Sequence, residues 1–250
     1  HAPRDHRTGC TGLGTFYGRH PESGTAIAQL ADMSLLIRNA DLLLTMDRNR
    51  RELHGGSVFV HGRSIEMLGS DADVLAWMAE EPLARMAERT IDAKGCVVMP
   101  GLVNGHHHLY QTLTRAVGTG AGLVLFDWLK LLYPVWGQMD PDAAYTSAKL
   151  ALCELLLSGA TTVSDHLYLF PNGVRLDDEI AAARDLGVRF HPTRGPMSVG
   201  VSAGGLPPDA LVEDEGVVLA DSQRVIEQYH DAGAGSMLRI ALAPCSPFSV

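Results

Sequence analysis

The chain has 250 residues, of which 46% are hydrophobic, and its formal net charge is -9. This length and composition are sufficient for the buried core of one large domain or somewhat more. The acidic balance argues against a nucleic-acid partner, because contacts to phosphates need a basic face. A small neutral or weakly polar ligand fits this charge better.

Cysteine use and hydropathy indicate the compartment. The four cysteines, Cys10, Cys96, Cys153 and Cys245, are far apart and form no C-x-x-C pair, which argues against a disulfide framework or a structural zinc knot. The sequence has no apolar stretch of about 18 residues and no signal-peptide core near its N-terminus. We therefore expect a cytoplasmic protein with no membrane partner.

The first third of the chain predicts a leader and a small β domain. Residues 1–32 mix Gly, Pro, Arg and His without periodicity, and we interpret them as a non-native or disordered leader. Apolar runs within 34–46 and 57–69, with His61-Gly62-Arg63-Ser64 as the turn, predict a hairpin. Residues 73–88 have helical spacing that Pro82 would kink or restart, and 89–105 are extended. We assign 33–95 to the small β domain.

Helices and strands then alternate. Asp140 is typical of an N-cap, Pro141 of a first helical position, and Gly159 of a helix end, which predicts a helix over 142–158. A strand at 160–166 follows, and the same unit recurs with helices in 176–187 and 215–233. Counted from the segment before the histidines, strands are predicted at about 97–103, 161–165, 188–193 and 238–243. This order predicts βα units on a parallel sheet.

A closed (βα)8 barrel needs eight strands and about 250 residues for the barrel alone. Residues 96–250 carry about half of that number of strands. The sheet is therefore either open and complete or the N-terminal half of a barrel. The ending APCSPFSV favours the half barrel.

Three consecutive histidines follow the apolar segment VVMPGLVNG. An extended chain places residues i and i+2 on the same side, so His106 and His108 are predicted to point into one site while His107 points away. Zinc binds neutral imidazole nitrogens and keeps one position for water in catalytic sites. An exposed histidine run is the alternative, but the carboxyl end of a strand is where barrel active sites are built.

The segment PGLVNGHHH resembles the N-x-H-x-H signature of the amidohydrolase superfamily, with Asn104, His106 and His108 in the motif positions. The runs HHHLYQTLTRA, FDWLKLLYPVW, ELLLSGATTVSDHLYLFPNG and APCSPFSV look like its branch of purine and triazine deaminases. The resemblance covers residues 33–250. It implies a metal-dependent (βα)8 barrel, of which about the first four units are present, beside a small β-sandwich domain.

The resemblance also implies an activity. This is the zinc-dependent deamination of an oxidised purine, 8-oxoguanine to urate plus ammonia, with one divalent transition metal per chain. Deamination of guanine, isoguanine or isocytosine, hydrolysis of s-triazines, and a non-catalytic half barrel remain open. The family's general acid and base and its further metal ligands lie on strands five, six and eight, so the catalytic residues of this chain are unknown. The implied partner is a small purine-like molecule, and a homo-oligomer is left open.

Three residues are candidates for substrate binding. Gln111 both donates and accepts hydrogen bonds, which suits the amide edge of a purine, although a polar residue after a strand is often simply solvated. Trp128 can form a flat apolar wall, but FDWLKLLYPVW is equally suited to helix packing. Cys245, with Ser246 beside it, ends the fourth predicted strand and faces the site by topology alone.

Two further histidines and one loop complete the candidates. His166 ends the second predicted strand and is either close to the metal or structural. His191 lies within its strand, which favours a structural role. The glycine-rich SAGGLPPDA lacks the order of glycines needed to cradle phosphates and predicts a surface loop.

Overall fold

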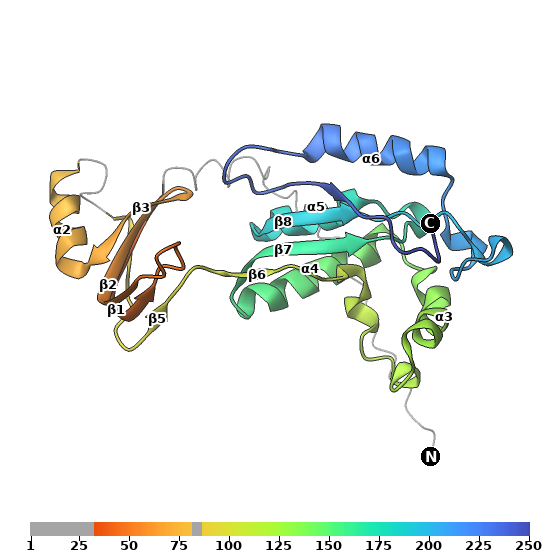
Figure 1. Cartoon of the computed structure of the whole chain (residues 1–250), viewed down its shortest axis with the longest axis horizontal. Helices are drawn as coiled ribbons and strands as arrows, with labels where there is room; N and C mark the ends of the chain where they lie inside the picture. The colour runs from red at the N-terminus through yellow and green to blue at the C-terminus, as the bar shows by residue number, and fades with distance from the viewer. Residues whose placement is uncertain (1–32, 82–86) are drawn as a thin grey trace, which may run out of the picture.

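The computed structural model describes residues 33–81 and 87–250. They form two units joined by one extended segment (Figure 1). The predicted leader, residues 1–32, and Pro82 lie outside the described residues. Within the described ranges, no helix combines the length and the apolar character that crossing a membrane requires.

The first unit is a five-stranded sheet. Strands β1 (Ser34–Leu44), β2 (Glu52–His61) and β3 (Ser64–Ser70) pair in antiparallel fashion, while β4 (Arg89–Asp92) and β5 (Val97–Val98) run parallel to β1. The predicted hairpin is confirmed, because His61 pairs with Ser64 across a two-residue turn. A β-sandwich consists of two facing sheets. The described residues of this unit instead form one sheet, and a helix packs against it.

That helix, α2 (Asp71–Glu80), differs from the predicted 73–88 at both ends. It begins earlier because Ser70 is the N-cap, with its Oγ accepting the Asp73 N–H at 3.2 Å. It ends by residue 80 because Glu81 precedes a proline, and a residue before proline disfavours helical geometry. Most of the remainder of the predicted helix falls on residues 82–86, outside the described residues.

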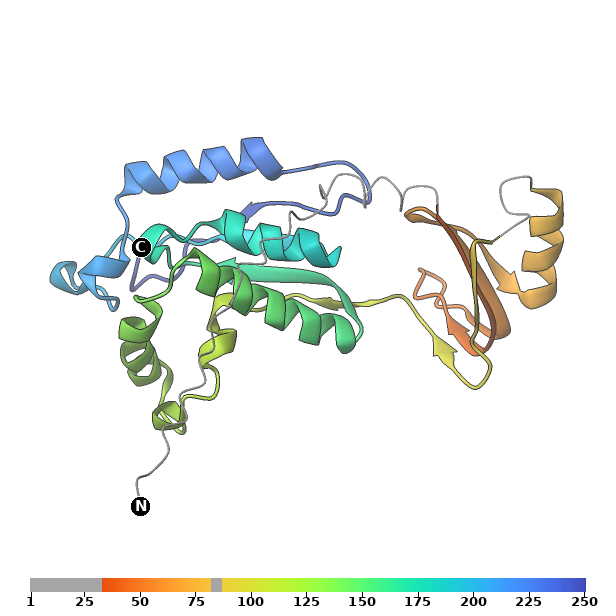
Figure 2. The ribbon, with the colours of Figure 1, turned by 180° about the vertical axis from the view of Figure 1, so that it is seen from behind.

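The second unit is a four-stranded parallel sheet in the order β6-β7-β8-β9. Its strands are β6 (Leu102–Asn104), β7 (Ala160–Leu167), β8 (Arg189–Arg194) and β9 (Ala241–Leu242). Helices α4 (Pro141–Leu157) and α5 (Leu176–Leu186) lie in front of the sheet when it is seen from behind (Figure 2), and α6 (Glu215–Tyr229) connects β8 to β9. The predicted βα units, and the partial barrel, are confirmed.

Two predicted strands are corrected. The strand expected at 97–103 is divided: β5 pairs with β1 of the first sheet and β6 pairs with β7 of the second. Pro100-Gly101 separates the two pieces, and Gly101 approaches β7 so closely that a Cβ there would lie 2.1 Å from Thr161 Oγ1. The strand expected at 238–243 is reduced to β9 and one isolated bridge between Phe190 and Leu238. An apolar run does not reveal which strand it will pair with.

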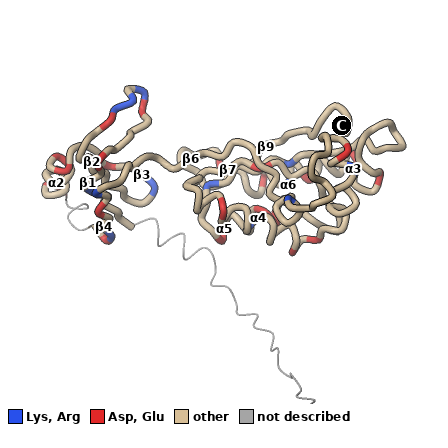
Figure 3. Tube along the Cα trace, turned by 90° about the horizontal axis from the view of Figure 1, so that it is seen from below, with Lys and Arg blue, Asp and Glu red and all other residues tan. Residues whose placement is uncertain are grey.

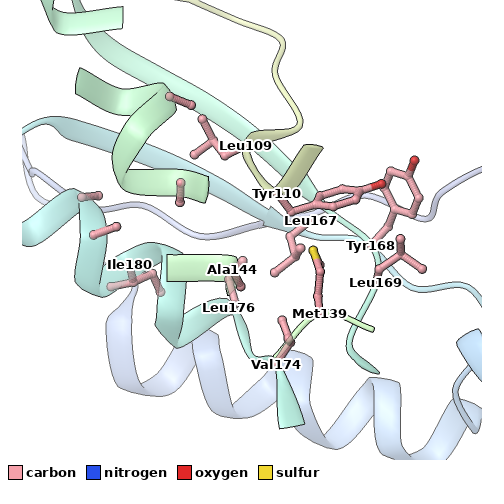
Figure 4. Packing of buried hydrophobic residues seen from close by; sticks show 14 of the residues in the cluster. Leu109, Tyr110, Met139, Ala144, Leu167, Tyr168, Leu169, Val174, Leu176 and Ile180 are labelled. Carbon is pink, nitrogen blue, oxygen red and sulfur yellow. The ribbon is translucent and has the colours of Figure 1, made fainter. Parts of the chain in front are cut away.

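The main core lies between the parallel sheet and its helices. Asp140 Oδ1 accepts the Ala143 N–H at 2.8 Å and so begins α4, as predicted. Alanines on one side of α4 allow close packing, and Trp136, at the end of α3 (Leu125–Trp136), is fully buried. Leu109, which follows the histidines, packs into this same core (Figure 4). Burying a leucine side chain contributes about 1.5–3 kcal/mol. Leu109 therefore anchors the chain that directly follows the three histidines to this core.

Charges are distributed over both units. Along the part of the chain described in Figure 3, Lys and Arg alternate with Asp and Glu rather than gathering on one face.

Candidate active site

Backbone and side-chain hydrogen bonds hold the histidine segment against β7. The His166 N–H donates to the His107 carbonyl at 3.0 Å, and the Leu109 N–H donates to Asp165 Oδ1 at 2.6 Å. From α4, Ser147 Oγ donates to the Leu109 carbonyl at 2.8 Å. The segment between β6 and the 3-10 turn η1 (Leu109–Thr114) is therefore fixed by β7 and α4.

His106 and His108 share one cavity of about 320 Å³, which His107 does not line. Their ring centroids are 5.2 Å apart. His108 Nδ1 lies 2.8 Å from the His166 carbonyl oxygen, and because a carbonyl only accepts, Nδ1 carries the proton and Nε2 keeps its lone pair. Burial lowers the pKa of His108, so its ring is neutral at neutral pH. A neutral imidazole with its other nitrogen bound to a carbonyl is the usual form of a metal-binding histidine.

The described residues place two histidines, His106 and His108, at the cavity rather than a complete metal site. Among residues 33–81 and 87–250, no three His, Cys, Asp or Glu side chains are grouped so that they could hold a metal ion. His166 also lines the cavity, but its Nε2 lies 2.9 Å from the Ala243 carbonyl and donates to it. Gly195 gives this ring room, since a Cβ there would lie 2.2 Å from Nε2. His106 and His108 thus fit as part of a larger ligand set.

Gln111 lies in the cavity in a fixed orientation. Its Nε2 donates to the hydroxyls of Tyr110 at 3.1 Å and Tyr168 at 3.3 Å. Burial raises the pKa of Tyr168 to about 12 and raises that of Tyr110 well above its ordinary value, so both hydroxyls stay protonated. Because the amide nitrogen is occupied, Oε1 is the atom of Gln111 that remains as an acceptor; it has no hydrogen-bond partner among the described residues.

The walls of the cavity are largely aromatic. Trp128 stands on α3 with its ring 5.3 Å from that of Trp136, and Phe126 contacts Phe248 at 5.1 Å. Cys245 also lines the cavity, and burial raises the pKa of its thiol and keeps it protonated. A cavity lined mainly by apolar and aromatic side chains, with a few polar groups among them, suits an aromatic heterocycle.

The structure brings most of the predicted residues together and adds others. Gln111, Trp128, Cys245 and Ser246 all line the cavity with the two histidines, whereas His191 is exposed on β8 and lies outside it. Tyr168 was not predicted, although it follows His166 by two residues and alternation along an extended chain could have revealed it.

Comparisons with known proteins agree with this arrangement. The model of the amidohydrolase family matches residues 97–250. The 8-oxoguanine deaminase of Pseudomonas aeruginosa is 46% identical over 216 residues, which is 86% of this chain and 46% of that protein. The hydroxydechloroatrazine ethylaminohydrolase of a Pseudomonas species is 31% identical over 211 residues, covering 82% of this chain and 44% of that protein.

Solved structures give the same result. The atrazine chlorohydrolase of Arthrobacter aurescens, complexed with zinc, superposes with a TM-score of 0.76 at 33% identity, over 86% of this chain and 47% of that one. The chain therefore spans about half the length of the relatives it matches. Since the family model covers the parallel sheet, the histidine segment and the cavity, the chain belongs to the amidohydrolase family.

Proposed function

We propose that the complete protein containing this chain is a zinc-dependent hydrolase that deaminates an oxidised purine base, converting 8-oxoguanine to urate and ammonia. The observation that carries the proposal is that His106 and His108 share one cavity lined mainly by apolar and aromatic side chains, with their ring centroids 5.2 Å apart. The 46% identity to an 8-oxoguanine deaminase supports the choice of substrate.

In this proposal His106 and His108 hold the metal through ring nitrogens. A related triazine hydrolase is complexed with zinc, and neutral imidazoles are ligands that zinc prefers. When bound, zinc lowers the pKa of water to about 7 and makes hydroxide available at neutral pH. The His166 carbonyl fixes the tautomer and the orientation of His108. The remaining ligands, and the general acid and base, come from outside the described residues.

The substrate is held by this chain's own side chains. Gln111 Oε1 accepts a ring N–H of the purine, because its amide nitrogen is bound by two tyrosines. Trp128 provides a flat wall, and the protonated Cys245 lines the same cavity without acting as a nucleophile. The substrate is thus placed with one edge towards the histidines.

The second candidate is hydrolysis of an s-triazine. It is favoured by the 33% identity and TM-score of 0.76 to a triazine hydrolase structure. A triazine fits the same flat cavity, but its ring lacks the fused amide edge that Gln111 would bind. We place the purine first because the identity to the 8-oxoguanine deaminase is higher. We expect a cytoplasmic enzyme, as predicted from the cysteines.

The metal part of the proposal is tested by elemental analysis of the complete protein. We expect His106→Ala and His108→Ala each to lose the zinc, because each removes one ligand, and His107→Ala to retain it. Circular dichroism of the three variants controls for folding. Equal zinc loss in all three variants would contradict the pairing of His106 with His108.

The substrate part is tested by following ammonia release. The compounds are 8-oxoguanine, guanine, isoguanine, isocytosine and an aminotriazine. Gln111→Ala should cost about 1–3 kcal/mol of substrate binding, since a buried partner is lost, with zinc content unchanged. Gln138→Ala, exposed after α3, is the matched control. Turnover of the triazine alone would exclude the purine, and no turnover by a zinc-loaded protein would support a non-catalytic role.

A further inference from the structure

Two acidic side chains, Asp165 and Glu179, are buried between the parallel sheet and its helices, away from the cavity. Asp165 lies on β7, between Val163 and Leu167 on the helix-facing side of the strand, and is 1% exposed. Glu179 lies on α5 and is fully buried. Carboxyl groups are rarely buried unless they are paired. The position of this pair therefore requires an explanation.

The two groups interact with each other rather than with a cation. Among the described residues, Asp165 Oδ2 and both oxygens of Glu179 have no donor of ordinary geometry, and the two carboxyl groups lie within interaction range of one another. Burial, and then repulsion by Asp165, raises the pKa of Glu179 well above its ordinary value. One proton shared between the two carboxyls joins one oxygen of Glu179 to Asp165 Oδ2, as in other closely spaced acid pairs.

Asp165 is the member of the pair that is directed at the histidine segment. Asp165 Oδ1 accepts the Leu109 N–H at 2.6 Å, a short bond of the kind that a carboxylate makes. Leu109 directly follows His108, and its side chain is fully buried in the core shown in Figure 4. The Asp165 carbonyl in turn accepts from Thr193 Oγ1 at 2.7 Å, which joins β7 to β8 at this level.

We propose that Asp165 and Glu179 are positioning residues: protonated Glu179 donates to the Asp165 carboxylate, and Asp165 holds the Leu109 amide so that His106 and His108 keep the geometry for metal binding. This inference rests on the proposed metal site. Neither Asp165 nor Glu179 lines the cavity, so the pair affects metal binding only through the position of the histidine segment.

The test compares four variants of the complete protein. Asp165→Ala removes the acceptor, Glu179→Met removes the donor at similar size, and Glu179→Gln keeps a donor that cannot be lost by ionisation. Val225→Ala is the control. Val225 is fully buried on α6, a different element from the histidine segment, so this substitution should lower the stability of the fold without removing the acid pair or the Leu109 hydrogen bond. The measurements are the zinc dissociation constant, by competition with a chelator, and amide hydrogen exchange of residues 105–114 in the metal-free protein.

We expect Asp165→Ala and Glu179→Met to weaken zinc binding about 10- to 100-fold, the range for groups that orient metal ligands, and to speed exchange of the segment. Glu179→Gln should restore both values to near wild type, and Val225→Ala should change neither. Unchanged zinc affinity in Asp165→Ala and Glu179→Met would reduce the pair to a purely structural role.

Two further outcomes keep the inference separable. If Asp165→Ala fails to fold, hydrogen exchange of the Leu109 amide in the folded wild type still tests the positioning role. Fast exchange of that amide, with no protection, would overturn the role. If His106→Ala and His108→Ala retain zinc, the proposed metal site itself is wrong. If those variants lose zinc while Asp165→Ala keeps it, only the positioning role is wrong.

Discussion

Replacing Arg194 by methionine should destabilise the second unit markedly. Arg194 ends β8 with its side chain 1% exposed. Its guanidinium donates two hydrogen bonds to Glu213, at 2.8 and 2.7 Å, and one to Asp221 at 3.1 Å. It also lies 3.7 Å over the ring of Phe170. This one side chain therefore connects β8 to α6 and to the segment that precedes α6.

The magnitude follows from burial. Removing one partner of a fully buried ion pair costs about 3–5 kcal/mol. Here Glu213 and Asp221 are 17% and 19% exposed, so water recovers part of this cost, and Asp221 keeps its bond to Arg224. The lost contact with Phe170 adds about 1 kcal/mol. We expect Arg194→Met to lower the free energy of unfolding by about 2–4 kcal/mol.

Urea denaturation of the complete protein measures this change, which corresponds to a midpoint shift of about 1 M at a slope of roughly 3 kcal/mol/M. Arg194→Lys should fall between wild type and Arg194→Met, because lysine keeps the charge but not the two-pronged geometry. Arg115→Met is the matched control: its ion pair with Glu154 is exposed, and its loss should leave the midpoint essentially unchanged. Equal midpoints for wild type and Arg194→Met would refute this reasoning about buried charge.

Three other changes test separate features. Gly101→Ala should lower the free energy of unfolding by about 1–3 kcal/mol, because the new Cβ would lie 2.8 Å from Thr161 Cβ, which no rotamer change can move. Gly118→Ala is the control, because a Cβ there meets nothing within 4 Å. Thermal melting temperatures of the two variants are compared with wild type. Asp140→Ala removes the N-cap of α4 and should cost about 1 kcal/mol by urea denaturation; a neutral result would mean that Pro141 alone sets this helix start. Burial raises the pKa of Glu179, so above the pKa of this residue in the unfolded chain the native state binds one more proton than the unfolded state. In that pH range the free energy of unfolding falls by up to about 1.4 kcal/mol per pH unit. Glu179→Gln should remove that slope, and parallel wild-type and variant curves between pH 5 and 8 would argue against the shared proton.

Local signals were sufficient to predict much of the second unit. The caps at Asp140 and Gly159 and the helical spacing between them act within a few residues, so α4 was placed nearly correctly. The segment 97–103 was not, because its division depends on two partners, β1 and β7, that are distant in the sequence. Pairing of this kind is decided by tertiary contacts and leaves little trace in an apolar run.

The site shows the same contrast. His106 and His108 followed from alternation alone, and they lie together in the cavity. Asp165 and Glu179 were missed because an acidic residue in a predicted strand, or in the first turn of a predicted helix, is usually exposed to solvent. Only the packing of α5 against the sheet shows that both carboxyls are enclosed. The position of Asp165 between two apolar residues of β7 was the one available signal.

The order of the parallel strands has a consequence for synthesis on the ribosome. In the order β6-β7-β8-β9, each strand pairs with the strand that emerged just before it. Every new βα unit can therefore dock onto an edge that already exists, without waiting for distant sequence, and domains generally fold as units from the N-terminus during translation. The histidine segment follows the first of these strands and is fixed by contacts with β7 and α4. The histidine end of the cavity can thus take shape early in translation, before the chain that follows β9 and carries Cys245 has emerged.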